Sequence, residues 1–305
     1  MVFAGLVPAV KAAVLLLLIR AAPRRNCGGG ALGNSADSHD MAVEKLHERL
    51  QELLPKPVEL WGVKVGTRSS LVGAEEKAVL ASFLRARDWD INDAYFMFKS
   101  SLEWRKIFGV DKLQHNQFGD MPRERFAGRD RHGRLLVVLR LGELQASNFN
   151  DLDKFVRWRV YMQEALNSQL NFASGEPSYT LVLNCEGFTR GHFSKAARQC
   201  ATELSKVSQD NYPDFLHQIL ICNPPGIFAF AFGVLRPFLP KNFVSMIQVH
   251  QCDEVHCIEL QQQRQLLGPA DGSRTRGRIP PRRARAAVMA AGGSKLGGVK
   301  ESSNE

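Results

Sequence analysis

The chain has 305 residues, of which 44% are hydrophobic and 23% are charged, a composition ordinary for a globular protein of one large domain or two small ones. Its formal net charge of +9 belongs to the two ends, because residues 1–36 carry +4, residues 271–305 carry +5, and the charges of residues 37–270 cancel. The body of the chain therefore lacks the basic excess typical of nucleic-acid-binding proteins, and nucleic acid is not expected as a partner.

The first 40 residues are predicted to be a targeting or disordered segment. Residues 12–19 form an eight-residue apolar run between Lys11 and three arginines, and this run is too short to span a bilayer. A secretory signal, an organellar transit peptide and a stretch upstream of the working start all have this pattern. Met41, which opens a helical pattern, is the alternative start.

Residues 41–118 are predicted to form a small helical N-terminal region. Apolar residues recur at helical spacing from Met41, and a second helix begins near Glu75. Asp90 is a suitable N-cap for a third helix, Ile91–Phe108. Helices joined by short turns are common, so this region alone indicates little about function.

After residue 119, strand and helix patterns alternate as far as residue 267. We expect strands at 135–141, 179–183, 217–223 and 243–249, and helices at 151–170, 192–207, 226–239 and 258–267. Helices of this length between strands are typical of parallel crossovers, so the fold class is α/β with a mostly parallel sheet. Residues 268–305 are rich in Gly, Ala, Ser, Pro and Arg and are predicted to be a disordered basic tail.

The helix expected at 226–239 is apolar on every side. Pro225 stands where a first helical turn tolerates proline, and Arg236 is the one charge in the helix. Its large apolar residues are Ile227, Phe228, Phe230, Phe232, Val234, Leu235, Phe238 and Leu239. Exposing several of them to water would cost on the order of 10 kcal/mol. The helix is therefore either ordinary core or a lid that covers a lipid and touches a membrane when open.

Four short blocks follow one another between residues 75 and 250. They are F-L-R-A-R at 83–87 with L-E-W-R-K at 102–106, D-R-H-G-R at 130–134, Q-D-N-Y-P-D at 209–214, and N-P-P at 223–225 with R-P-F-L at 236–239. In this order they resemble the CRAL-TRIO lipid-binding proteins, which include yeast-type phosphatidylinositol transfer proteins and carriers of tocopherol and retinal.

The resemblance implies a CRAL-TRIO lobe, residues 119–267, whose sheet forms the floor of a lipid cavity. It also implies headgroup contacts from Arg87, Glu203 and Arg236, since two cations suit a phosphate and a carboxylate can accept hydrogen bonds from inositol hydroxyls. The gating helix would then be 226–239. Its cavity-facing residues would be Ile227, Phe228, Phe230, Phe232, Leu235 and Phe238.

Each headgroup residue also has an ordinary structural interpretation. Arg87 can pair with Asp88 or Asp90 at a helix end, Glu203 can be a solvated residue of a surface helix, and Arg236 can bind the last carbonyls of its own helix.

The chain also departs from the family pattern. Arg236 stands where Lys is usual, and Asp88 replaces a common basic residue. The segment N-C-E-G at 184–187 lacks the carboxylate of the commoner D-x-x-G, and the closing L-P-x-E-Y-G-G segment is absent after His250.

Other candidate sites are weaker. His250, Cys252, His256 and Cys257 are close in sequence, but their spacing fits no common structural zinc site, so no metal is predicted. The lone histidines at 115, 132 and 192 are expected to be solvated. G-x-S-x-G, Walker A and H-E-x-x-H are absent, so we predict no catalytic residue and no enzyme activity. Cys185 and Cys222 end expected strands and are predicted to be buried free thiols, which favours a reducing compartment.

The resemblance thus implies a lipid-transfer protein for phosphatidylinositol or a related phospholipid, with the bound lipid as ligand and no other cofactor. Two alternatives stay open: a carrier of a neutral hydrophobe such as a tocopherol, retinoid or squalene, and an interaction domain that exchanges no lipid. The expected partners are a hydrophobic small molecule and, transiently, a membrane surface. We expect a cytoplasmic monomer, or an organellar protein if residues 1–36 are a transit peptide.

Overall fold

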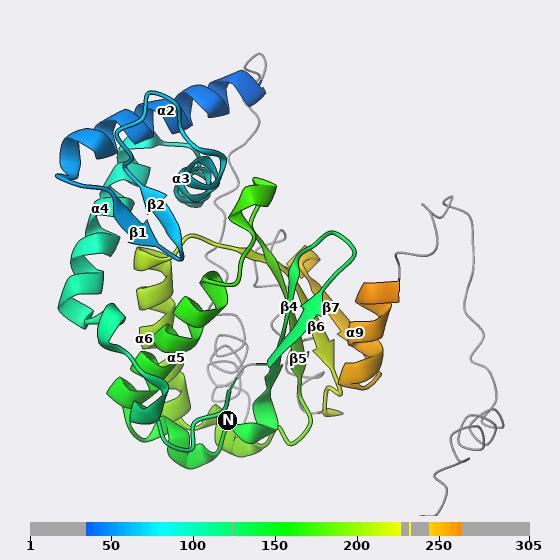
Figure 1. Ribbon diagram of the computed structural model, residues 1–305. Helices are drawn as coiled ribbons and strands as arrows, with labels where there is room; N and C mark the ends of the chain where they lie inside the picture. Colours follow the sequence, from blue (N-terminus) through cyan, green and yellow to red (C-terminus); the bar gives the residue numbers. More distant parts are fainter. Residues whose placement is uncertain (1–34, 124, 227–231, 233–243, 264–305) are drawn as a thin grey trace, which may run out of the picture. The chain divides into compact units, whose positions relative to one another are not determined.

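The computed structural model describes residues 35–123, 125–226, 232 and 244–263 (Figure 1). Three helices come first: α2 (Ser35–Leu53), α3 (Ala74–Ala86) and α4 (Ile91–Phe108), of which α2 begins six residues before Met41. The predicted cap of α4 is confirmed, because the Asp90 carboxylate accepts a hydrogen bond of 2.8 Å from the N–H of Asp93. Gly109 ends α4 in the left-handed conformation, with φ of 75°.

A hairpin that the sequence did not reveal joins α2 to α3. Its strands β1 (Val58–Leu60) and β2 (Val63–Val65) have three residues each and pair antiparallel around Trp61 and Gly62. Both turn residues have positive φ, as a two-residue hairpin turn requires. Trp61 is buried, and its ring lies 5.4 Å from that of Phe215, so the hairpin packs on the second half of the fold.

The second half is built on a five-stranded sheet, in the order β3-β4-β5-β6-β7. The strands are β3 (Arg125–Arg129), β4 (Leu135–Arg140), β5 (Tyr179–Asn184), β6 (Leu216–Cys222) and β7 (Ile247–His250). The four strands β4 to β7 are parallel, which confirms the predicted α/β class. The edge strand β3 is antiparallel to β4 and was not predicted, because its side chains are largely exposed.

The D-R-H-G-R block at 130–134 forms the turn between β3 and β4. The buried Asp130 carboxylate accepts hydrogen bonds from the N–H groups of His132 (2.8 Å) and Arg134 (3.0 Å) and from the Arg134 guanidinium (2.7 Å). Burial opposes ionisation of Asp130, but the hydrogen bonds from Arg134 and His132 outweigh it and lower its pKa. This block therefore has a structural role.

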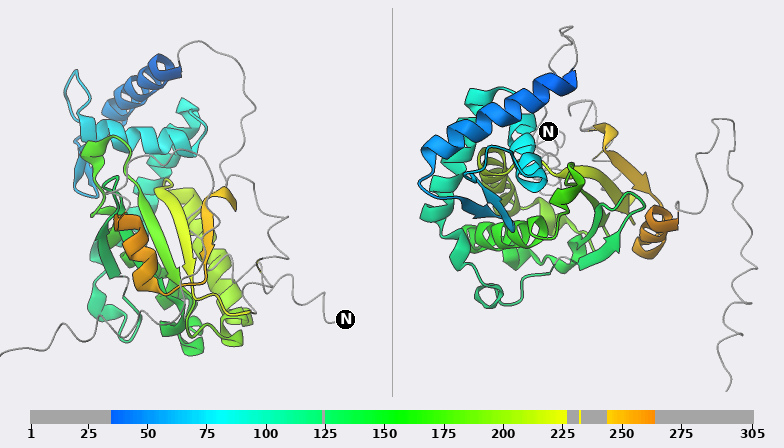
Figure 2. Two further views of the ribbon diagram at one scale, coloured as in Figure 1. Left: turned by 90° about the vertical axis from the view of Figure 1, so that its right-hand side faces the viewer. Right: turned by 45° about the horizontal axis from the view of Figure 1, so that its top comes forward.

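The two faces of the sheet are covered by different helices (Figures 1 and 2). Leu139, Leu181 and Ile221 belong to the main core, together with residues of α5 (Leu152–Asn167) and α6 (Lys195–Asn211). The intervening residues, such as Val182, face the other way and pack with α9 (Glu254–Gln263). Short 3₁₀ turns complete the described fold: η1 (Val110–Lys112), η2 (His115–Gln117), η3 (Leu141–Glu143), η4 (Ala146–Phe149), η5 (Phe172–Ser174) and η6 (Arg190–Phe193).

Most of the apolar helix expected at 226–239 lies outside the described residues. Gly226 and Phe232 are described, and both are helical. None of the helices that the structure describes has the length and apolar character needed to cross a bilayer.

Candidate functional site

An apolar hollow lies at the carboxyl end of β4, where α5 and α6 approach the sheet. Its wall includes Phe155 and Trp158 from α5, Leu204 from α6, and Leu139 at the end of β4. These side chains are all buried. The hollow has a volume of about 20 Å³, which is room for roughly one water molecule, so an acyl chain can enter only if neighbouring groups move.

A larger hollow, about 420 Å³, lies near the amino ends of β4 and β6. Its walls carry polar side chains, among them Arg134, Glu176 and His217. It suits water or a polar ligand better than an acyl chain.

Two polar side chains line the small apolar hollow, and sequence reasoning missed both. Arg159 of α5 is 9% exposed, and its guanidinium carbon lies 5.2 Å from the centre of the Trp158 ring. Its helical position is the available signal, because Phe155 and Met162, four residues before and three after it, are buried on the same side of α5.

The expectation that His192 is solvated was wrong, because this side chain is 5% exposed. Its Nε2 lies 3.0 Å from the carbonyl oxygen of Leu141, and its Nδ1 accepts a hydrogen bond of 3.1 Å from the N–H of Thr189. These partners assign the proton to Nε2. The ring also stacks on Phe188, so the loop after β5 folds back over the end of β4 and covers the histidine.

Arg87 ends α3 and reaches across to the end of α6. Its guanidinium donates to the carbonyl oxygens of Ala86 (3.0 Å) and Gln209 (3.1 Å). A cation near the last carbonyls of a helix is favourable, so this contact links the two helix ends.

Glu203 lies on α6 with its side chain 44% exposed, 3.4 Å from the ammonium group of Lys206. It lies six residues, or about 9 Å of helix, before the carbonyl that Arg87 contacts. The structure does not bring these two residues into direct contact through any of the bonds described above.

Phe232 is the described member of the predicted gating set. It is helical and half-buried, and it packs against the main core on the α5 and α6 side of the sheet. Ile227, Phe228, Phe230, Leu235 and Phe238 lie outside the described residues, as does the third headgroup candidate, Arg236.

A buried polar network joins the N-terminal helices to the second half of the fold. Arg105 of α4 makes a two-pronged ion pair with Glu164 of α5, with N–O distances of 2.7 and 2.8 Å. The hydroxyl of Tyr212, which follows α6, donates to the same carboxylate at 2.6 Å. Burial and the Glu164 charge raise the pKa of Tyr212, so it stays a neutral donor.

A second network lies at the carboxyl edge of the sheet. Glu254 of α9 accepts two hydrogen bonds of 2.8 Å from Arg140 and one of 3.0 Å from Asn184. Hydrogen bonding from Arg140 lowers the pKa of Glu254, although burial opposes this shift. Asn184 stands where the usual pattern has a carboxylate, and here α9 supplies the carboxylate instead.

Comparisons with known sequences agree with this architecture. The sequence model of the CRAL/TRIO domain matches residues 125–265, and that of the CRAL/TRIO N-terminal domain matches residues 42–100. The chain belongs to the CRAL/TRIO family. The predicted family resemblance is thereby confirmed.

Related CRAL/TRIO proteins include Patellin-3 of Arabidopsis thaliana, which is 27% identical over 234 residues, or 71% of this chain and 47% of the relative. Another is the Arabidopsis thaliana phosphatidylinositol/phosphatidylcholine transfer protein SFH4, 27% identical over 187 residues, or 56% of this chain and 31% of the relative. The chain thus spans about a third to a half of the length of these curated relatives.

The crystal structure of Sfh5 has the same CRAL/TRIO fold. It matches with a TM-score of 0.58 and 18% sequence identity, over 72% of this chain and 82% of Sfh5. In this CRAL/TRIO protein, the L-E-W-R-K and Q-D-N-Y-P-D blocks meet in the network of Arg105, Glu164 and Tyr212. At least part of the sequence signature therefore serves to hold the helical region to the sheet.

Proposed function

We propose that the chain binds one lipid on the α5 and α6 side of its sheet and exchanges it with a membrane. The observation that carries this proposal is the position of Phe232, half-buried against the core that also lines the apolar hollow. The sequence around Phe232 is apolar on every side of a helix. Movement of that helix offers a route by which the small hollow becomes large enough for a lipid.

The ligand we propose is phosphatidylinositol or a related phospholipid, held at its headgroup by Arg87, Glu203 and Arg236. The name of the relative SFH4, a phosphatidylinositol/phosphatidylcholine transfer protein, supports this class of ligand. The proposed function is transfer without chemistry, so no catalytic residue is assigned.

A neutral hydrophobe is the second candidate ligand. Two of the three headgroup residues have other partners: Arg87 bonds carbonyl groups at two helix ends, and Glu203 lies beside Lys206. A ligand with a small polar end would need fewer charged contacts, and the buried pair of Arg159 and His192 supplies polar groups within an apolar wall.

We further propose that the protein acts as a monomer that touches membranes transiently at the cytoplasmic surface. The five cysteines in the described part of the chain are free, which fits a reducing compartment. A cysteine proteome of this kind is rare in oxidising compartments, where paired cysteines persist.

Lipid extraction and native mass spectrometry of the purified full chain test the proposal. One bound phospholipid, together with transfer of labelled phosphatidylinositol between vesicles, is the expected result. A bound neutral lipid would select the second candidate. A folded protein that holds no lipid and transfers none would contradict both and leave a protein-interaction domain.

The headgroup assignment is tested by Arg236→Ala. Transfer of phosphatidylinositol is expected to fall at least about tenfold, the equivalent of losing one charge-assisted hydrogen bond to phosphate. Arg236→Lys should retain most of the activity because Lys keeps the charge. Lys56→Ala, at an exposed site, is the charge-matched control. Transfer by Arg236→Ala at the wild-type rate would rule out a headgroup role for Arg236.

A further inference from the structure

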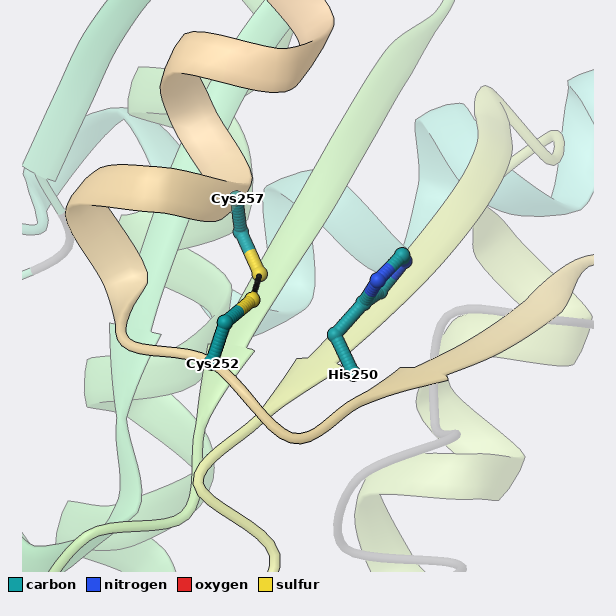
Figure 3. Close-up of side chains that lie close together, drawn as sticks. All are labelled: His250, Cys252 and Cys257. Atoms are coloured by element: carbon teal, nitrogen blue, oxygen red, sulfur yellow. Dashed lines mark hydrogen bonds between the residues drawn. The ribbon is translucent and has the colours of Figure 1, made fainter. Parts of the chain in front are cut away.

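Three potential metal ligands meet at the carboxyl end of β7, on the α9 side of the sheet (Figure 3). His250 ends β7, Cys252 lies in the turn that follows, and Cys257 lies in the second turn of α9. One ligand atom from each residue lies within 4.8 Å of the other two, and the two sulfur atoms are 3.0 Å apart.

The sheet register explains why these residues meet. Arg140, Asn184, Cys222 and His250 are consecutive partners across β4, β5, β6 and β7, so they form one row. Side chains in one row point to the same face of a sheet. The buried Cys222 in this row packs in the same small cluster as Cys257, which puts a third thiol beside the set.

The imidazole of His250 has an unmet bonding requirement. Its Nε2 is buried and has no hydrogen-bond partner among the described residues. A buried nitrogen without a partner is unfavourable, whereas coordination of a metal would satisfy its lone pair.

The backbone holds the set in place before any ion arrives. The N–H of Asn223 donates to the carbonyl oxygen of Cys252 at 3.2 Å, which ties the turn to the end of β6. Asp253 caps α9, since its carboxylate accepts from the N–H of His256 at 2.9 Å. The residue that precedes the cap and the one four residues after it are therefore fixed relative to the sheet.

We propose that His250, Cys252 and Cys257 form a binding site for a zinc ion. Two thiolates and one imidazole suit a borderline-soft divalent ion, and together with Zn²⁺ they carry no net charge, which suits a cluster packed on apolar side chains. In a tetrahedral site with Zn–S bonds of about 2.3 Å, two sulfurs lie roughly 3.8 Å apart. The sulfur atoms here need to separate by somewhat less than an ångström.

A disulfide between Cys252 and Cys257 is the competing outcome. It would require the sulfurs to approach to about 2.05 Å. It would also leave Nε2 of His250 without a partner, whereas a metal engages all three groups. The zinc ion would clip α9 to β7, independently of any lipid on the opposite face.

The test is the metal content of the full chain, purified without a histidine tag under reducing conditions from zinc-supplemented medium. We expect about one zinc ion per chain by elemental mass spectrometry. His250→Ala and Cys252→Ser should each weaken zinc binding by more than about 100-fold, since even second-shell changes cost 10–100-fold.

Two variants serve as controls. His256→Ala removes an exposed histidine from the same helix, and Cys200→Ser removes a buried thiol from α6; both should keep the full metal content. Wild-type protein without zinc, or a chain two hydrogens lighter because Cys252 and Cys257 form a disulfide, would overturn the proposal. Unchanged zinc content in both ligand variants would do the same. Cys252 is half-buried, so its serine variant should fold even where a change at the buried Cys257 does not.

Discussion

The two faces of the sheet are held by different kinds of contact. On the α5 and α6 side, a continuous apolar core extends from β4, β5 and β6 to the N-terminal helices and the Trp61 hairpin. On the α9 side, the buried apolar cluster is small and includes Val138, Val182 and Leu220. There α9 is positioned by the ion pair between Glu254 and Arg140 and by the cluster of thiols and imidazole.

This difference indicates a division of roles. Apolar contacts have little directionality, so the α5 and α6 side can exchange protein side chains for acyl chains at modest cost. Hydrogen bonds and metal ligands demand fixed distances and angles. The α9 side is therefore suited to stay in place while the opposite face opens.

The largest effect should come from the apolar side. Trp158 is 2% exposed, and its indole N–H donates to the carbonyl oxygen of Pro122 at 3.0 Å. Trp158→Ala should lower the free energy of unfolding by about 3–5 kcal/mol, because it leaves a cavity and an unpaired carbonyl. Urea unfolding followed by circular dichroism measures this change.

Phe96→Ala is the control for that prediction, because Phe96 lies on a helix with 59% of its surface exposed. Its loss should change the free energy of unfolding by no more than about 0.5 kcal/mol. Equal effects of the two substitutions would mean that the α5 side is not the stability-determining core.

A smaller and more local effect is expected on the α9 side. Glu254→Gln removes the charge that binds Arg140, at an expected cost of about 1–2 kcal/mol. Hydrogen exchange should accelerate in β7 and α9 and remain unchanged in α5. Glu259→Gln, at an exposed position of the same helix, should leave exchange as it is. Uniform acceleration throughout the sheet would show that the two faces are not held independently.

Local signals allowed much of the fold to be predicted from the sequence. Asp90 specifies the start of α4 through a bond to the backbone three residues on, and alternating apolar patterns revealed four of the five strands of the main sheet. The hairpin β1–β2 and the edge strand β3 were missed. Three-residue strands and an exposed strand do not show the alternation on which such predictions depend.

The site was less predictable because it depends on long-range pairing. His250 and Cys222 are 28 positions apart in sequence, and only the register of β6 with β7 puts them in one row. The burial of His192 likewise depends on its contact with the Leu141 carbonyl, 51 residues away. Headgroup residues could be named through the family resemblance, but Arg159 could be found only after the orientation of α5 was known.

The smallest expected effect belongs to the turn at the amino end of β4, which does not depend on either covering layer. Asp130 has a lowered pKa in the folded state, so its contribution to stability is complete above the usual carboxyl pKa of about 4 and is lost as the pH falls further. Asp130→Asn should cost about 1 kcal/mol or less at neutral pH and flatten the loss of stability in acid. Asp120→Asn, at an exposed site, should keep the wild-type slope. An unchanged acid slope in Asp130→Asn would mean that other carboxylates govern acid unfolding, whichever face they support.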